Sequence, residues 1–146
     1  MEQAENKIDF FVRTSLPPVE GIFYQGQIFD AYVFVANLIK SAQKSIVLID
    51  NYIDESVFTM LDKRNDSISA TIYTKTLSKQ LELDVQKHNE QYKPIELKIA
   101  NAIHDRFLLI DNDVYHIGAS LKDLGKKLFA FSKFETKANE ILRFFY

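Results

Sequence analysis

Residues 45–49 read Ser-Ile-Val-Leu-Ile, a short run that is almost entirely apolar. A strand buried on both faces has such a run, whereas a strand with one face in water alternates apolar and polar residues. Residues 27–43 come before it, and their apolar side chains recur at steps of three and four, which predicts a helix. A helix that leads into a fully buried strand favours an α/β fold with a parallel sheet.

The remainder of the chain continues this alternation. Apolar and β-rich runs predict further strands at 68–73, 95–99, 107–110, 114–117 and 128–131. Helical spacing predicts helices at 56–64, 78–92 and 135–145. Early strands that alternate with helices pair in parallel through right-handed crossovers, whereas residues 111–113, Asp-Asn-Asp, suit a tight antiparallel hairpin turn. We therefore predict the α/β class, with a mixed β-sheet flanked by helices.

The position of the prolines divides the chain into two segments. Residues 1–20 are interpreted as an N-terminal extension or linker, because Pro17 and Pro18 cannot continue a helix. Within it, residues 8–12 form either a short strand or an ordered tail, and a further module upstream stays open. Residues 21–146 are predicted to form one domain, a size that buries an adequate core.

Charge and composition narrow the function classes. The formal net charge of −2 argues against a protein that coats nucleic acid non-specifically, although it leaves room for a local basic groove. The absence of cysteine excludes disulfides and thiolate metal sites. No apolar run is long enough to cross a bilayer, and the first residues lack the pattern of a secretion signal. We expect a cytoplasmic protein with no membrane partner.

The segment from residue 104 to residue 123 carries the chemistry. On an extended chain His104 and Arg106 point to the same side, so an imidazole and a guanidinium are presented together. After the hairpin turn, Gly118 and Ser120 return beside them. Glycine allows close approach of a ligand, and the serine offers a hydroxyl and a backbone N–H to a phosphate oxygen. A histidine, a fixed cation and an anion cradle are the groups that phosphoryl transfer uses.

These residues resemble the HKD motif of the phospholipase D-like superfamily, in its bacterial single-motif form. That motif has a His, one residue, a Lys, four residues, an Asp, six residues, a Gly and then a Ser. The chain matches the spacing with His104, Arg106, Asp111 and Gly118, and Ser120 follows one residue late. It departs from the motif in two further ways: Arg replaces Lys, and a segment with Asp123 replaces the Asn that often follows the Ser.

The resemblance implies phosphodiester transfer through a phosphohistidine intermediate, with no metal and no cofactor. His104 is then the nucleophile, and Arg106 neutralises the phosphate. Asp111 completes the catalytic group as a structural or orienting carboxylate. Phosphate is bound by Arg106 together with Gly118 and Ser120. Active members of the superfamily combine two motifs, so a chain with one motif implies a homodimer with an isologous interface.

Other residues are candidates for the pocket. Asn51, Tyr52 and Lys75 each follow a predicted strand, and ligands of open α/β sheets bind at the carboxyl ends of strands. His116 lies on the same strand face as Gly118, and Lys122 begins a local basic cluster. For these positions ordinary loop or solvated side chains remain the alternative, and His88 is predicted to be solvated on a polar helix.

Two functions from different classes follow. The leading hypothesis is a phosphodiesterase, a metal-independent nuclease that acts as a homodimer on nucleic acid or another phosphodiester. The alternative is a catalytically weak or inactive module that binds phosphate or nucleic acid, or that dimerises, within a DNA-binding regulator.

Overall fold

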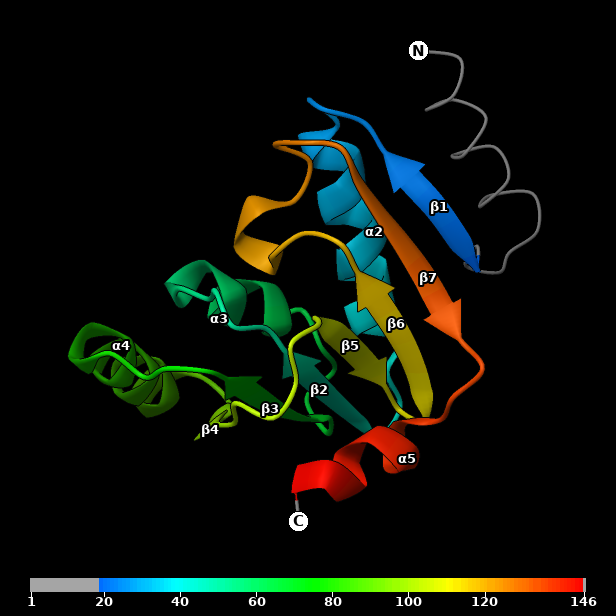
Figure 1. Ribbon diagram of the computed structural model, residues 1–146. Coiled ribbons are helices and arrows are strands. Elements are labelled where there is room, and N and C mark those ends of the chain that lie inside the picture. The colour runs from blue at the N-terminus through cyan, green and yellow to red at the C-terminus, as the bar shows by residue number, and fades with distance from the viewer. Residues whose placement is uncertain (1–18, 146) are drawn as a thin grey trace.

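A seven-stranded mixed sheet organises the protein, with helices on both of its faces (Figure 1). The computed structural model describes residues 19–145. The predicted fold class, an α/β domain with a mixed sheet and flanking helices, is confirmed.

The elements follow the predicted order closely. The strands are β1 (Glu20–Phe23), β2 (Ser45–Ile49), β3 (Ser69–Thr74), β4 (Glu96–Ile99), β5 (Phe107–Ile110), β6 (Asp113–Ile117) and β7 (Phe129–Phe134). The helices are α2 (Ile28–Ser41), α3 (Glu55–Leu61), α4 (Lys79–Gln91) and α5 (Ala138–Leu142), with short 3-10 turns η1 (Leu121–Asp123) and η2 (Arg143–Phe145). The closing helix predicted for 135–145 is therefore shorter and is split between α5 and η2.

The strand order is β1-β7-β6-β5-β2-β3-β4. Strand β2 pairs in parallel with β3, and β3 pairs in parallel with β4, as the alternation with helices predicts. Strands β5 and β6 form the predicted hairpin, in which Asp111 takes a left-handed conformation with φ 55°. Antiparallel pairing of β2 with β5 joins the two halves of the sheet.

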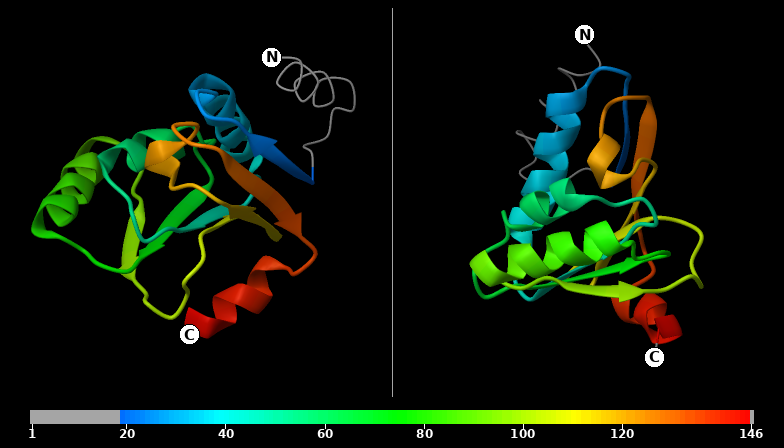
Figure 2. Two further views of the ribbon diagram at one scale, coloured as in Figure 1. Left: turned by 45° about the horizontal axis from the view of Figure 1, so that its top comes forward. Right: turned by 90° about the vertical axis from the view of Figure 1, so that its left-hand side faces the viewer.

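Both faces of the sheet are covered, which explains the unbroken apolar runs. Alternate residues of β2 and β5 pack on one face against α2, α3 and Leu81 of α4. The residues between them pack on the other face with Ala138 and with the apolar side chains of α5 and η2. Figure 2 shows α2, α3 and α4 together on one side of the sheet, and α5 apart from them.

Strand β1 was not predicted. It lies at the edge of the sheet and pairs antiparallel with β7, so Glu20 lies opposite Ser132. Of its side chains only Phe23 is buried, and this gives no alternation from which a strand could be recognised. The strand or tail expected at 8–12 and the two prolines of the linker lie outside the described residues.

Between residues 19 and 145, no helix combines the length and apolar character needed to cross a membrane.

Candidate functional site

Most of the predicted site residues lie along the edge of the sheet that is formed by the ends of its strands. Strands β2 and β3 end at this edge, the antiparallel β5 begins there, and β6 ends there. The segment before β5 therefore lies beside the residues that follow β2. Because the pairing places His116 opposite Phe107, the chain after β6 returns to the same place.

A buried carboxylate that was not predicted as a site residue lies at the centre of this edge. Asp50 directly follows β2, and its side chain is 0% exposed. Its oxygens accept hydrogen bonds from the backbone N–H of Tyr52 (3.0 Å) and of Leu121 (3.1 Å), and from the Ser120 hydroxyl (2.9 Å). Arg106 Nε lies 3.1 Å from Asp50 Oδ1. The carboxylate thus connects β2, the segment before β5 and the turn after β6.

The guanidinium of Arg106 faces this carboxylate and is 19% exposed. The distance is that of an ion pair, but the Nε–H is not directed at Asp50 well enough to form a hydrogen bond. One terminal nitrogen donates to the carbonyl oxygen of Ile117 at 3.3 Å. The buried Oδ1 of Asn51, the residue after Asp50, also has no hydrogen-bond partner among the described residues. Arg106 Nε and Asn51 Oδ1 are therefore two buried polar atoms without a hydrogen bond within this part of the chain.

The hydroxyl of Ser120 is turned into the protein. It lies 2.9 Å from Asp50 Oδ2 and 2.7 Å from the carbonyl oxygen of Tyr52, so two acceptors share its one proton. The residue is 6% exposed. Its hydroxyl is therefore engaged in fastening the loops after β2 and β6 together.

Gly118 makes a close approach to a strand, where the sequence suggested a ligand. Its backbone N–H donates to the carbonyl oxygen of Ala130 at 2.8 Å. A Cβ at this position would lie 2.8 Å from the same oxygen, which is closer than packing allows. The glycine thus allows β7 to pass beside the end of β6.

His104 lies at the outer rim of this edge with a fully exposed side chain. Its Nδ1 is 3.4 Å from Oδ1 of Asp105. The other carboxylate oxygen of Asp105 is 3.7 Å from His116 Nε2, so two imidazoles flank one carboxylate. The His116 ring is stacked on Phe134 and meets Phe107 edge-on, which restricts its orientation. The His104 side chain is thus exposed, whereas the Arg106 guanidinium is mostly buried and faces Asp50.

Asp111 does not lie with these residues. It occupies the turn between β5 and β6, at the opposite edge of the sheet. Its carboxylate accepts hydrogen bonds from the backbone N–H groups of Gln43, Lys44 and Ser45, the shortest at 2.7 Å. Burial opposes ionisation, but these N–H groups outweigh it and hold the pKa of Asp111 below its ordinary value. Of the two roles expected for Asp111, structural or orienting, these contacts fit the structural one, because the carboxylate fixes the start of β2.

The remaining pocket candidates lie at the edge that carries His104. The Tyr52 side chain is 65% exposed, although its backbone is held on both sides by Asp50 and Ser120. Lys75 is exposed just after β3. Lys122 lies on η1, with its ammonium 3.7 Å from Asp123. A hydrogen bond from Lys126 and the charges of both lysines hold the pKa of Asp123 below its ordinary value. That carboxylate is thus paired with lysines.

Two residues of the site were missed in the sequence. Asp50 had a usable signal, since a carboxylate directly after a fully buried strand requires a cation or several donors nearby. Asp105 had none, because its proximity to His116 depends on the hairpin register. Between residues 19 and 145, no group of three His, Cys, Asp or Glu side chains is arranged to hold a metal ion.

Comparison with known proteins indicates the fold. No protein-family model matches the sequence, and no curated protein matches it either. NucT from Helicobacter pylori has a similar solved structure, with 13% identity and a TM-score of 0.57 over 85% of this chain and 89% of that chain. This similarity supports a phospholipase D-like fold. TrmBL2, an archaeal chromatin protein whose structure is described as showing a novel mode of DNA binding, matches with 13% identity and a TM-score of 0.49. That match covers 97% of this chain and 55% of the TrmBL2 chain.

Proposed function

We propose that the protein is a phosphodiesterase of phospholipase D-like type, a metal-independent nuclease in which His104 is the nucleophile. The observation that carries this proposal is the exposed imidazole of His104 at the edge where β2 and β3 end. Asp105 lies beside Nδ1, so the Nδ1–H tautomer is favoured and the lone pair of Nε2 is open to solvent. The fold similarity to NucT supports a nuclease of this type.

In the proposed reaction the Nε2 lone pair attacks phosphorus, and the bond from phosphorus to the leaving oxygen breaks. A proton must reach that oxygen, and we assign its delivery to the protonated His104 of a second copy of the chain in a homodimer. Water then attacks the phosphohistidine, the P–N bond breaks, and the water proton returns to that second imidazole. Neither step changes an oxidation state.

Arg106 supplies positive charge to the phosphate in this proposal. The charge is partly balanced by Asp50, and only part of the guanidinium reaches the surface. Gly118 and Ser120 contribute by shaping the turn around the phosphate, because the N–H of Gly118 and the Ser120 hydroxyl are already bonded within the protein. Phosphate binding is thus expected to be weaker than at a site with a free lysine.

The same contacts favour a second candidate function, a module that binds phosphate or nucleic acid without cleaving it. In that case Asp50, Arg106 and Ser120 act as a structural clasp, and the exposed His104 contributes only charge or hydrogen bonding. Such a module could dimerise within a longer DNA-binding regulator.

The test uses the purified chain with fluorescently labelled DNA and RNA oligonucleotides in the presence of EDTA. Cleavage is expected for the unsubstituted protein, and His104→Ala should lower it by at least about a thousandfold, because loss of a nucleophile removes the covalent route. Asn101→Ala, an exposed position in the same loop, is the matched control and should retain activity. An acid-labile covalent adduct between the protein and an oligonucleotide fragment should be trapped by rapid quenching at alkaline pH, and it should be absent from His104→Ala.

Cleavage that survives His104→Ala would overturn the assigned nucleophile. Binding without any cleavage, with equal affinity in the unsubstituted and His104→Ala proteins, would select the binding module. Light scattering separately tests the homodimer, since a monomeric and fully active protein contradicts the assignment of the acid to a second copy.

A further inference from the structure

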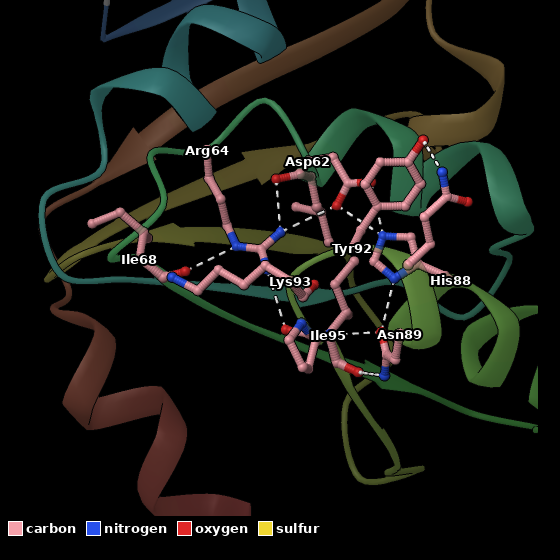
Figure 3. Close-up of polar contacts among 11 residues, drawn as sticks. Asp62, Arg64, Ile68, His88, Asn89, Tyr92, Lys93 and Ile95 are labelled. Atoms are coloured by element: carbon pink, nitrogen blue, oxygen red, sulfur yellow. Dashed lines mark hydrogen bonds and ion pairs between the residues drawn. The ribbon is translucent and has the colours of Figure 1, made fainter.

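A second polar cluster lies at the edge of the sheet opposite His104, where α3 ends and α4 returns (Figure 3). His88 of α4 was predicted to be solvated, but its side chain is only 8% exposed. It lies between Asp62, the residue that follows α3, and Asn89. The buried imidazole therefore has a defined polar environment.

Both ring nitrogens of His88 face oxygen atoms. Nε2 lies 2.8 Å from both carboxylate oxygens of Asp62, and Nδ1 lies 2.8 Å from Oδ1 of Asn89. The orientation of the Asn89 amide is fixed independently by Ile95. Its oxygen accepts from Ile95 N–H at 3.0 Å, and its NH₂ group donates to the Ile95 carbonyl oxygen at 3.0 Å. If the Asn89 amide were flipped, its NH₂ group would face the Ile95 N–H and its oxygen would face the Ile95 carbonyl oxygen, so neither hydrogen bond could form.

A neutral imidazole has one N–H and one lone pair, so it can satisfy only one of these two acceptors. The imidazolium has two N–H groups and satisfies both. The guanidinium of Arg64 also lies 3.5 Å from the Asp62 carboxylate. We infer that His88 is held as an imidazolium and that its protonation docks α4 on the end of α3.

Little apolar packing supports α4 besides this contact. Leu81 is its one buried apolar side chain, Val85 is partly buried against the core, and most of the surface of α4 is polar. Phe58 and Tyr92 lie beside the imidazole with ring centroids 5.7 and 5.4 Å away. The titratable and charged groups around His88 are Asp62 and Arg64 at the end of α3 and Tyr92 just after α4. After deprotonation the one remaining N–H stays on Nε2 toward Asp62, and the Nδ1 lone pair faces the Asn89 oxygen. The contact with Asp62 then loses its charge assistance, and α4 should loosen as the imidazolium loses its proton.

The protein contains three histidines, which allows a direct test. In the variant His104→Gln/His116→Gln, His88 is the sole imidazole. Long-range ¹H–¹⁵N spectra of the histidine side chain should show two protonated nitrogens at pH 6. Amide hydrogen exchange, corrected for intrinsic rates, should show α4 protection falling roughly tenfold between pH 6 and pH 8.5, the scale of one charge-assisted hydrogen bond. Protection of β2 and β5 should change much less.

The matched control adds His88→Gln to the same background. Its α4 amides should be weakly protected at both pH values, because glutamine cannot donate to both Asp62 and Asn89 from the ring positions. A singly protonated ring at pH 6 in the protein with native His88 would overturn the inference, whether or not the control folds. Equal α4 protection at pH 6 and pH 8.5 would overturn it as well.

Discussion

Replacing Asp50 with asparagine tests whether this carboxylate holds the candidate site together. The substitution preserves shape but turns one acceptor oxygen into an NH₂ group. In one orientation the amide leaves the N–H of Leu121 without its acceptor; in the other it opposes the N–H of Tyr52 and the Arg106 guanidinium. Either way a backbone N–H is orphaned, which costs about 1–3 kcal/mol.

The loss of the charge adds to that penalty. Breaking a buried ion pair costs about 3–5 kcal/mol, and the partial exposure of Arg106 lowers that figure. We expect Asp50→Asn to lower the free energy of unfolding by about 3 kcal/mol, equivalent to a fall in Tm of about 10 °C. Urea unfolding followed by circular dichroism measures it. Asp66→Asn, at an exposed turn after α3, is the control and should change stability by less than about 0.5 kcal/mol.

A double-mutant cycle separates the pair from the backbone contacts. Arg106→Met alone leaves the buried Asp50 without its cation, whereas the double variant removes both charges. The losses of unfolding free energy in the two single variants should therefore add up to at least about 1 kcal/mol more than the loss in the double variant. A loss below about 1 kcal/mol in Asp50→Asn, or additive losses in the cycle, would refute the role assigned to the ion pair.

Three further perturbations follow from the structure. Asp111 has a lowered pKa, so its contribution to stability is present above about pH 4 and is lost as the pH falls further; Asp111→Asn should show a smaller loss in acid unfolding curves. Gly125→Ala should destabilise the fold by about 3 kcal/mol more than Gly26→Ala in urea unfolding. Both glycines have positive φ, but only at Gly125 would the new Cβ lie 2.5 Å from backbone atoms. Arg64→Met should cost about 3 kcal/mol by the same measurement, because the buried side chain donates to the carbonyl oxygens of Ile68, Leu61, Lys93 and Pro94, and all four hydrogen bonds would be lost; an unchanged midpoint would contradict this.

The sequence predicted the central strands because their signal is local. Strand β2 is apolar at successive positions since both of its faces are covered, and β5 is apolar for the same reason. The edge strand β1 lacked such a signal, because its exposed residues obey no alternation. Hydrophobic pattern thus identified the strands in the middle of the sheet and missed one at its margin.

The site was less predictable because its decisive contacts are long-range and polar. The spacing from His104 to Ser120 brought the right segments to one edge, but it did not show that Arg106 and Ser120 are bonded to Asp50, which precedes them by more than fifty residues. The burial of His88 by Asp62 has the same cause. Whether a polar side chain on a loop or helix is exposed depends on the partner that the fold supplies, and no local pattern encodes that partner.

The carboxylates of Asp50 and Asp111 lie at the two ends of β2 and connect it to the hairpin of β5 and β6. Since β2 and β5 form the seam between the parallel and antiparallel halves of the sheet, a slip of one residue along this seam would break both fastenings at once. Sliding of one half past the other therefore has no gradual path. Under mechanical load or during thermal fluctuations, we expect the two halves of the sheet to move together as a rigid body until the pairing of β2 with β5 breaks cooperatively.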